Sequence, residues 1–254
     1  LYDLGARTYK RVLGRVKRGE LTWAAPLLPR AQRRGLENAA ALLPENGASR
    51  WRQERLNTPA CGSFLHLHLG FDASGLDDLP IHTVWVGDWE RGITAERNAV
   101  VVSIPSVLDP GMAPAGQHVL HAYTPANEPW ELWSGLDRST PDYERQRADR
   151  CQVFWHVLEQ RIPDLRSRCQ VVMEGTPLTH RHYLSVHNGS YGPALSAAQG
   201  LFPGVQTPVK GLLQCGASTF PGIGIPPVAA SGAMAAHAIT GKKAQAELLE
   251  SLAL

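Results

Sequence analysis

The sequence predicts a mixed α and β fold whose sheet is mostly antiparallel. Apolar and polar residues alternate over residues 63–70, which is the two-residue period of a half-buried strand. Several short strand-like runs follow, separated by Gly, Pro and Asp turns, and together they would make a mostly antiparallel sheet. One long segment, residues 140–161, has an apolar helical face. With 43% hydrophobic and 19% charged residues over 254 positions, the chain has the composition of a globular protein and not of a disordered one.

The first 60 residues are basic and are expected to be helical in pieces. In the strand at 63–70, one face is wholly apolar and the other carries an aromatic ring and two imidazoles. These faces are formed by Leu65, Leu67 and Leu69 and by Phe64, His66 and His68. Further strands are predicted at residues 81–86, 99–104, 118–124 and 169–174. Thr140-Pro141 is typical of a helix start, and residues 185–210 are rich in turns.

Residues 212–232 hold the most informative pattern. A strand is predicted at Leu212 and Leu213, followed by a turn rich in Gly, Ser and Pro. Glycine allows a positive φ and lets the main chain approach a ligand with no Cβ between them. The turn contains three glycines suited to this purpose, Gly216, Gly222 and Gly224.

A helix of very small residues is predicted to begin near Ile225 and to stop at Gly241. Pro226 and Pro227 fit its first turn, where backbone amides lack partners within the helix. That end carries about half a positive charge, so it suits an anion or a polarised carbonyl oxygen. The pattern favours a backbone built against a flat ligand, with a segment that merely packs in a core as the alternative. On the predicted helix, the residues at helical spacing form a narrow stripe that allows close packing: Val228, Ser231, Gly232, Ala235, Ala236 and Ile239.

This segment resembles the C-terminal flavin-binding motif of the carotenoid isomerase and phytoene desaturase family of FAD-dependent oxidoreductases. Further blocks are similar to the family in the same order, and their number makes the resemblance specific; it covers roughly residues 40–240. The blocks are residues 63–72, 88–96, 102–106, 118–125, 131–133 with 136–138, 175–180 and 190–194.

The resemblance implies the C-terminal part of a fold like that of FAD-dependent amine oxidases and phytoene desaturases. A mostly antiparallel substrate-domain sheet with helices would be joined to the last strand and helix of the FAD domain. The implied segments are a basic, unassigned region at 1–38, a substrate-binding domain at 39–210, an FAD-domain element at 211–241 and a tail at 242–254.

The chain departs from the family pattern in two places. The family has Gly-Asp-Ser where this chain has Gly216-Ala217-Ser218, and that Asp is expected to bind the sugar-alcohol chain of FAD. Its loss would cost about 1–3 kcal/mol, or roughly ten- to a hundredfold in affinity. The family's N-terminal Rossmann unit, with its Gly-x-Gly-x-x-Gly turn, is also absent, since Gly222-Ile223-Gly224 continues to Pro227 where a third Gly is needed. Because the sequence begins at Leu1 and not at Met, an incomplete C-terminal portion is expected.

The function implied by the resemblance is that of an FAD-dependent cis-trans isomerase of carotenoids or other long polyenes, or of a related carotene desaturase. Two alternatives stay open, namely a cofactor-free binder of apolar ligands or inactive remnant, and a His-ligated metal enzyme. Whether this chain alone is an enzyme is left open, since the dinucleotide-binding unit is lacking. The residues implied to contact FAD are Gly216, Ala217, Ser218, Thr219, Phe220, Pro221, Gly222, Gly224, Ile225 and Val228.

Charge is distributed unevenly. Residues 1–55 contain twelve Lys or Arg and five Asp or Glu, a net charge of +7, which leaves −5 for the remainder of a chain with net charge +2. A basic arm suits an anionic membrane surface, and we favour this partner over nucleic acid because the family's substrates dissolve in membranes. No window has the 18 or more consecutive apolar residues of a membrane span, and no signal peptide is recognisable. We therefore expect a peripheral membrane location, in a plastid or on the cytoplasmic side of a bacterial membrane, and no secretion.

The metal hypothesis depends on histidines in His-x-His pairs and on nearby acidic residues. No fixed ligand pattern such as His-Glu-x-x-His is present, so ordinary half-buried histidines are favoured over a metal site. The residues that could form it are His66, His68, His118, His121, His180, His182, Asp88 and Glu90.

Other candidates carry weaker signals. Glu90, Arg91 and His180 have suitable chemistry for an acid or base, with structural roles favoured. Trp89, Trp130 and Trp133 could line an apolar channel, although core packing is the favoured interpretation. The four cysteines form no Cys-x-x-Cys pair and are expected to be buried thiols: Cys61, Cys151, Cys169 and Cys215.

Overall fold

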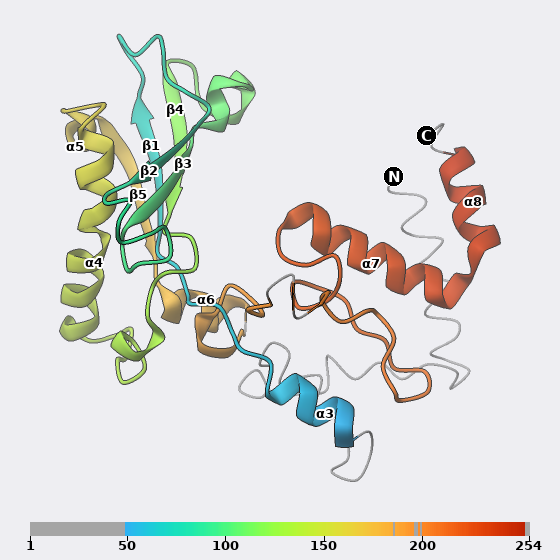
Figure 1. Ribbon diagram of the computed structural model, residues 1–254. Helices are drawn as coiled ribbons and strands as arrows, with labels where there is room; N and C mark the ends of the chain where they lie inside the picture. The colour runs from blue at the N-terminus through green and yellow to red at the C-terminus, as the bar shows by residue number, and fades with distance from the viewer. Residues whose placement is uncertain (1–48, 185, 196–197, 199, 252–254) are drawn as a thin grey trace. The chain divides into compact units, whose positions relative to one another are not determined.

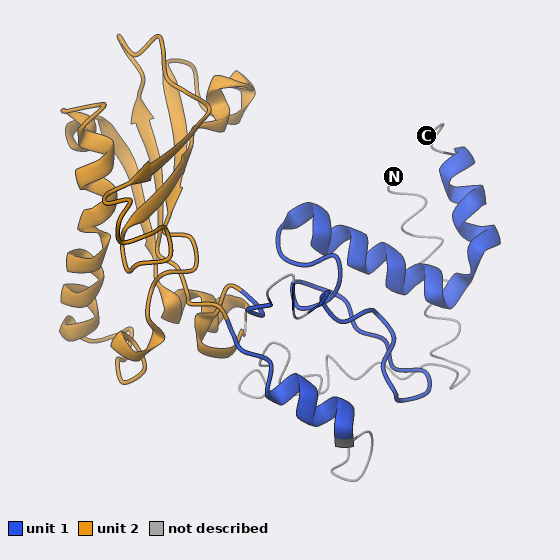
Figure 2. Ribbon diagram, viewed as in Figure 1, with its two compact units in different colours: residues 1–60, 192–254 blue, residues 61–191 orange. Residues whose placement is uncertain are grey.

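The computed structural model describes residues 49–251 apart from residues 185, 196, 197 and 199. The described part forms two compact units (Figures 1 and 2). One comprises residues 61–191, and the other comprises the described residues within 49–60 and 192–251. The basic region at 1–38 and the last residues of the predicted tail lie outside the described residues.

The unit at 61–191 is built around a five-stranded antiparallel sheet in the order β2-β3-β4-β1-β5. The four strands predicted after residue 80 are confirmed to within two residues at each end, and the strand predicted at 63–70 begins and ends later. The strands of the sheet are β1 (His66–Asp72), β2 (His82–Val86), β3 (Ala99–Ser103), β4 (Gln117–Tyr123) and β5 (Cys169–Gly175).

One long helix, α4 (Pro141–Glu159), packs against one face of this sheet (Figure 1). Thr140 caps it by accepting a hydrogen bond from the Tyr143 amide at 3.4 Å, and Pro141 occupies the first turn, as predicted. Phe154 and Trp155 meet the leucines of β1 in the core. The predicted apolar face of the first strand is confirmed, because Leu65, Leu67 and Leu69 are all buried.

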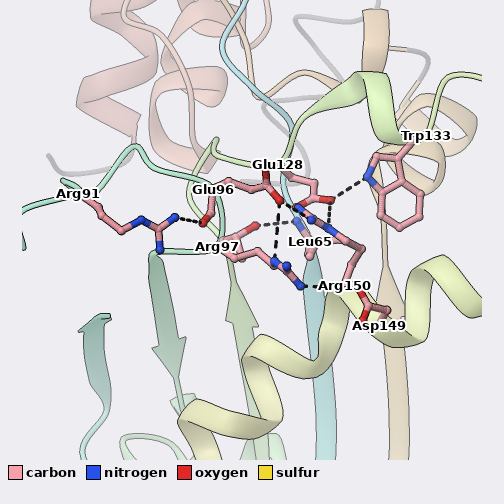
Figure 3. Close-up of polar contacts among 9 residues, drawn as sticks. Leu65, Arg91, Glu96, Arg97, Glu128, Trp133, Asp149 and Arg150 are labelled. Atoms are coloured by element: carbon pink, nitrogen blue, oxygen red, sulfur yellow. Dashed lines mark hydrogen bonds and ion pairs between the residues drawn. The ribbon is translucent and has the colours of Figure 1, made fainter. Parts of the chain in front are cut away.

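A buried ion pair fixes the loop after β4 to α4 (Figure 3). The Arg150 guanidinium donates to both carboxylate oxygens of Glu128, and the Trp133 indole N–H donates to Glu128 Oε1 at 2.8 Å. The Glu128 backbone also pairs with Ser63 in both directions at 3.0 Å. Since Ser63 precedes β1, this contact ties the start of β1 to the helix that covers the sheet.

Short helices complete the unit at 61–191. Pro177–Leu184 forms α6 directly after β5, and Gly175 and Thr176 make the junction between them. The others are η3 (Pro105–Val107), η4 (Pro110–Met112), η5 (Trp130–Leu132), α5 (Leu165–Arg168) and η6 (His187–Gly189).

The other unit contains three helices among its described residues: α3 (Ser49–Leu56), α7 (Ile225–Thr240) and α8 (Lys242–Ser251). The start of α7 at Ile225 and its end before Gly241, which has a φ of 81°, confirm the predicted helix. The strand predicted at Leu212 and Leu213 is wrong: Leu213 forms only an isolated bridge with Gln206. Pro208 lies just after that partner and has no N–H to donate, so a ladder cannot extend there.

The expectation of buried thiols holds for Cys151 alone. Cys61 and Cys169 are half-buried, and Cys215 is exposed. Burial raises the pKa of the Cys151 thiol. The Cys215 thiol should therefore react much faster with a thiol-labelling reagent than the Cys151 thiol does.

Candidate functional site

The residues expected to contact a flavin form one continuous turn that ends at the start of α7. Gly216 and Gly224 have φ values of 120° and 112°, a region that residues with a Cβ rarely adopt. Among the described residues, apart from Gly216 and its two chain neighbours, no atom lies within 4 Å of the position that a Cβ on Gly216 would occupy. The turn therefore presents bare main chain at Gly216, as a flat ligand would require.

Ser231 on α7 holds this turn in place. Its Oγ accepts a hydrogen bond from the Gly216 amide at 2.8 Å and donates to the Val228 carbonyl at 2.7 Å. The side chain is fully buried, so both bonds are shielded from water. The sequence marked Ser231 only as part of a packing stripe, because a contact fifteen residues apart leaves no periodic signal.

The start of α7 offers fewer amide donors than a free helix end usually does. Pro226 and Pro227 carry no N–H, and the Val228 amide donates to the Gly224 carbonyl at 2.9 Å. Ile225 is thus the one residue in the first three helical positions that has an amide hydrogen. Its side chain is 87% exposed, so this end of α7 is open to a ligand.

The remaining predicted contact residues differ in their exposure. Thr219 and Gly222 are buried, and Phe202 lies 3.4 Å from the position of a Cβ on Gly222. Ala217, Ser218 and Phe220 are half-buried, whereas Pro221, Gly224 and Val228 are exposed. The exposed residues of this set therefore all lie between Pro221 and Val228.

The sheet face opposite α4 presents apolar and imidazole side chains. Residues directly opposite each other on antiparallel strands share a face, so the register defines rows across the sheet. Val84 on β2 and Met173 on β5 belong to this face and are 63% and 59% exposed. One row consists of His82, Ser103, His121, His68 and Met173, and its neighbour consists of Val84, Val101, Tyr123, His66 and Gly175.

Three histidines of these rows converge. His66 Nδ1 lies 2.5 Å from His121 Nε2, and one nitrogen from each of His66, His68 and His121 lies within 4.8 Å of the others. Burial is the main cause that lowers the pKa of His66 to about 2 and that of His121 to about 4; neighbouring imidazoles add to it. At neutral pH these rings are uncharged, so they add no net charge to the sheet face.

His180 on α6 belongs to the same neighbourhood. Its ring centroid lies 4.8 Å from that of His66 and 3.9 Å from that of Phe64. Burial lowers the pKa of His180 to about 4, so it is unsuited to act as an acid at neutral pH. His182, two residues further on, is exposed.

The other predicted metal ligands do not join this group. Asp88 accepts a hydrogen bond from the Glu90 amide at 2.8 Å in the loop after β2. His118 Nδ1 is hydrogen-bonded to Ser106 Oγ at 2.8 Å, next to η3. The group that the described residues form therefore contains imidazoles alone.

The remaining candidates have structural surroundings. Arg91 donates to the Glu96 carbonyl at 3.2 Å (Figure 3). Trp133 is fully buried in the core and cannot line an open channel, whereas Trp89 is exposed. Trp130 packs against the core, and the Arg181 guanidinium lies 5.4 Å from the centroid of its ring system.

Comparison with curated proteins gives clear sequence relatives. The chain is 37% identical over 183 residues to the chloroplastic prolycopene isomerase of Daucus carota and 36% identical over 183 residues to that of Arabidopsis thaliana. Each alignment covers 70% of this chain, and it covers 29% and 30% of the respective relatives. The phytoene desaturase of Rhodobacter capsulatus is 28% identical over 214 residues, which is 78% of this chain and 40% of that protein.

The chain thus spans less than a third of the length of the two prolycopene isomerases. No protein-family model matches it. Among solved structures, an oxidoreductase from Methanosarcina mazei gives a TM-score of 0.42 at 15% identity, covering 82% of this chain and 41% of that one.

Proposed function

Because this chain is homologous to the carotenoid isomerase and phytoene desaturase family, we propose that it supplies the polyene-binding sheet and one wall of the flavin site of an FAD-dependent carotenoid isomerase or desaturase. The observation that carries this proposal is the turn at residues 216–228. It combines bare main chain at Gly216, an open helix start at Ile225 and an internal clamp at Ser231.

These features fit a flavin. A flat ring system needs close approach to the backbone, which Gly216 permits, and a donor for its polarised edge, which the Ile225 amide would supply. Ala217 offers no carboxylate, so the contact to the sugar-alcohol chain expected in the family is missing. We therefore expect binding of FAD that is weak and that improves when this acceptor is restored.

In the family, the bound flavin supplies the redox chemistry. An isomerase uses it without net oxidation or reduction of the substrate, and a desaturase uses it to remove hydride equivalents. The residues of this chain would bind the flavin and orient the polyene against it. The positive end of α7 would stabilise negative charge on a ligand near Ile225. The clamp at Ser231 would keep the Gly216 main chain from moving away.

The sheet face opposite α4 is suited to a long apolar substrate. It presents Val84, Val101 and Met173 together with the aromatic ring of Tyr123. An exposed apolar surface of this kind favours a ligand that leaves water to cover it. A carotenoid or a similar polyene meets that requirement.

We also propose a peripheral membrane location for the chain. The curated relatives named above include chloroplastic enzymes. No helix in the described part of the chain is both long and apolar enough to cross a membrane. Peripheral contact through the basic region at 1–38 would bring the chain to a membrane-dissolved substrate.

Two binding measurements on the purified chain test the function. FAD is titrated while its fluorescence is followed, and a carotene in detergent is tested for co-elution on gel filtration. Binding of both ligands supports the proposal. Binding of the carotene alone would instead support the cofactor-free apolar-ligand binder, and binding of neither would contradict both assignments.

A further inference from the structure

A group of histidines lies on the sheet face opposite α4, here called the open face. It is separate in sequence from the turn at residues 216–228, the proposed flavin turn. His66 and His68 are two residues apart on β1, so both project from the same face. His121 on β4 lies directly opposite His68 in the antiparallel register. Two adjacent strands thus supply three imidazoles to one place.

The distances suit a small cation after modest side-chain adjustment. A zinc–nitrogen bond of about 2.0–2.1 Å in tetrahedral geometry places the ligating nitrogens about 3.4 Å apart. The three nitrogens now lie within 4.8 Å of one another, and the closest pair, His66 Nδ1 and His121 Nε2, is 2.5 Å apart. Small rotations that widen the close pair and draw in His68 would equalise these distances. His68 is exposed, so its ring is free to make that movement.

The hydrogen bonding among these rings is incomplete. His66 Nδ1 and His121 Nε2 share one proton, yet His66 Nε2 is buried without a hydrogen-bond partner among the described residues. His180 Nε2 is also buried and has no hydrogen-bond partner among the described residues. The centroid of the His180 ring lies 4.8 Å from that of His66. Metal-bound histidines usually donate from their second nitrogen to an outer acceptor. With the two ring centroids 4.8 Å apart, a rotation that brings His180 Nε2 within reach of His66 Nε2 would make it that acceptor and satisfy both nitrogens.

We propose that His66, His68 and His121 bind a divalent first-row transition metal of the Zn²⁺ type. Neutral imidazoles suit Zn²⁺, Co²⁺, Ni²⁺ and Cu²⁺, whereas Mg²⁺ and Ca²⁺ prefer oxygen ligands, which this group does not contain. Three protein ligands leave the fourth tetrahedral position for water or another small ligand. The exposed side of His68 is where that ligand would enter.

The test uses the untagged full chain, stripped with a chelator and then titrated with Co²⁺ and Zn²⁺. Bound metal is measured by elemental analysis after gel filtration, and Co²⁺ coordination is followed by its visible absorption. We expect about one ion per chain. Either His68→Asn or His121→Asn should weaken binding at least tenfold.

His156→Asn is the matched control. His156 lies on the surface of α4 and is hydrogen-bonded to Gln160 at 3.1 Å, away from the β1 and β4 imidazoles. It should leave both the metal content and the Co²⁺ spectrum unchanged, and circular dichroism checks that each variant is folded. The proposal is overturned if the stripped wild-type chain takes up no stoichiometric metal, or if folded His68→Asn and His121→Asn bind as well as wild type. Flavin binding by the same samples is a separate readout, so failure here would leave the proposed function standing.

Discussion

Arg150 donates two hydrogen bonds to Glu128, from Nε to Oε1 at 2.9 Å and from Nη2 to Oε2 at 2.8 Å, and both side chains are buried. Arg150 lies on α4, and Glu128 lies in the loop after β4 (Figure 3). Arg150 Nη1 also contacts Glu96, so the same guanidinium reaches the loop that precedes β3. One cation therefore holds together two loops at one end of the sheet.

Breaking this ion pair should destabilise the unit at 61–191. Glu128→Ala leaves the Arg150 charge buried and removes the acceptor of the Trp133 indole, which should cost about 3–5 kcal/mol. Urea unfolding followed by tryptophan fluorescence measures the change. Asp142→Asn is the control, because Asp142 pairs with Arg145 on the exposed side of the same helix and such pairs contribute little. Equal stability of Glu128→Ala and wild type would show that the pair is not needed for folding.

The flavin turn should depend on the buried hydroxyl of Ser231. Ser231→Ala removes the acceptor of the Gly216 amide, with a cost of about 1–3 kcal/mol if that amide stays buried. We expect a lower unfolding free energy and weaker FAD binding. Ser251→Ala is a close match, since Ser251 also donates to a carbonyl three residues earlier in a helix but contacts no part of the turn that the structure describes. If both variants bind FAD equally well, Ser231 does not position the site.

Cysteine labelling should distinguish the turn from the core. Cys215 is exposed and directly precedes Gly216, whereas burial raises the pKa of the Cys151 thiol. A maleimide should therefore modify Cys215 in the native protein and Cys151 only after denaturation. Saturating FAD should slow the labelling of Cys215, while half-buried Cys169 serves as the internal reference. Peptide mass spectrometry measures both rates, and a Cys215 rate unaffected by bound FAD would place the flavin elsewhere.

A charge on the open sheet face should impair polyene binding. Met173→Lys introduces an ammonium on the open sheet face, directly opposite His68, and covering it with a polyene would require its desolvation. We expect carotene binding to weaken about tenfold or more, a change of roughly 1.4 kcal/mol per factor of ten. Val172→Lys is the matched control, because Val172 is similarly exposed but points to the other side of the same strand. Similar losses in both variants would indicate a general effect of charge.

Local patterns predicted much of the fold. The alternation that buries Leu65, Leu67 and Leu69 placed β1, and the Thr140-Pro141 start placed α4. The strand expected at Leu213 did not form, because whether an apolar pair becomes a strand depends on a partner that can extend the ladder.

Contacts between distant segments were beyond sequence reasoning. The sequence shows His66 and His68 as a pair, but nothing in it indicates that His121 lies opposite His68, since strand register depends on the packing of the whole sheet. The pairing of Glu128 with Arg150 is likewise a tertiary contact across 22 positions. For the turn at residues 216–228, the glycine pattern indicated a ligand-binding segment, which stays a prediction. The structure added the contact of Ser231 with Gly216, and it shows that Ile225 is the one residue in the first three positions of α7 with an amide hydrogen.

The most direct test of the account is the affinity of FAD for the wild-type chain and for Ala217→Asp, measured by fluorescence titration or calorimetry. The account predicts measurable binding to wild type and an affinity roughly ten- to a hundredfold higher for Ala217→Asp, because the restored carboxylate can accept hydrogen bonds from the sugar-alcohol chain. Absence of FAD binding to both folded proteins, or equal affinity for the two, would contradict the assignment of residues 216–228 to a flavin site.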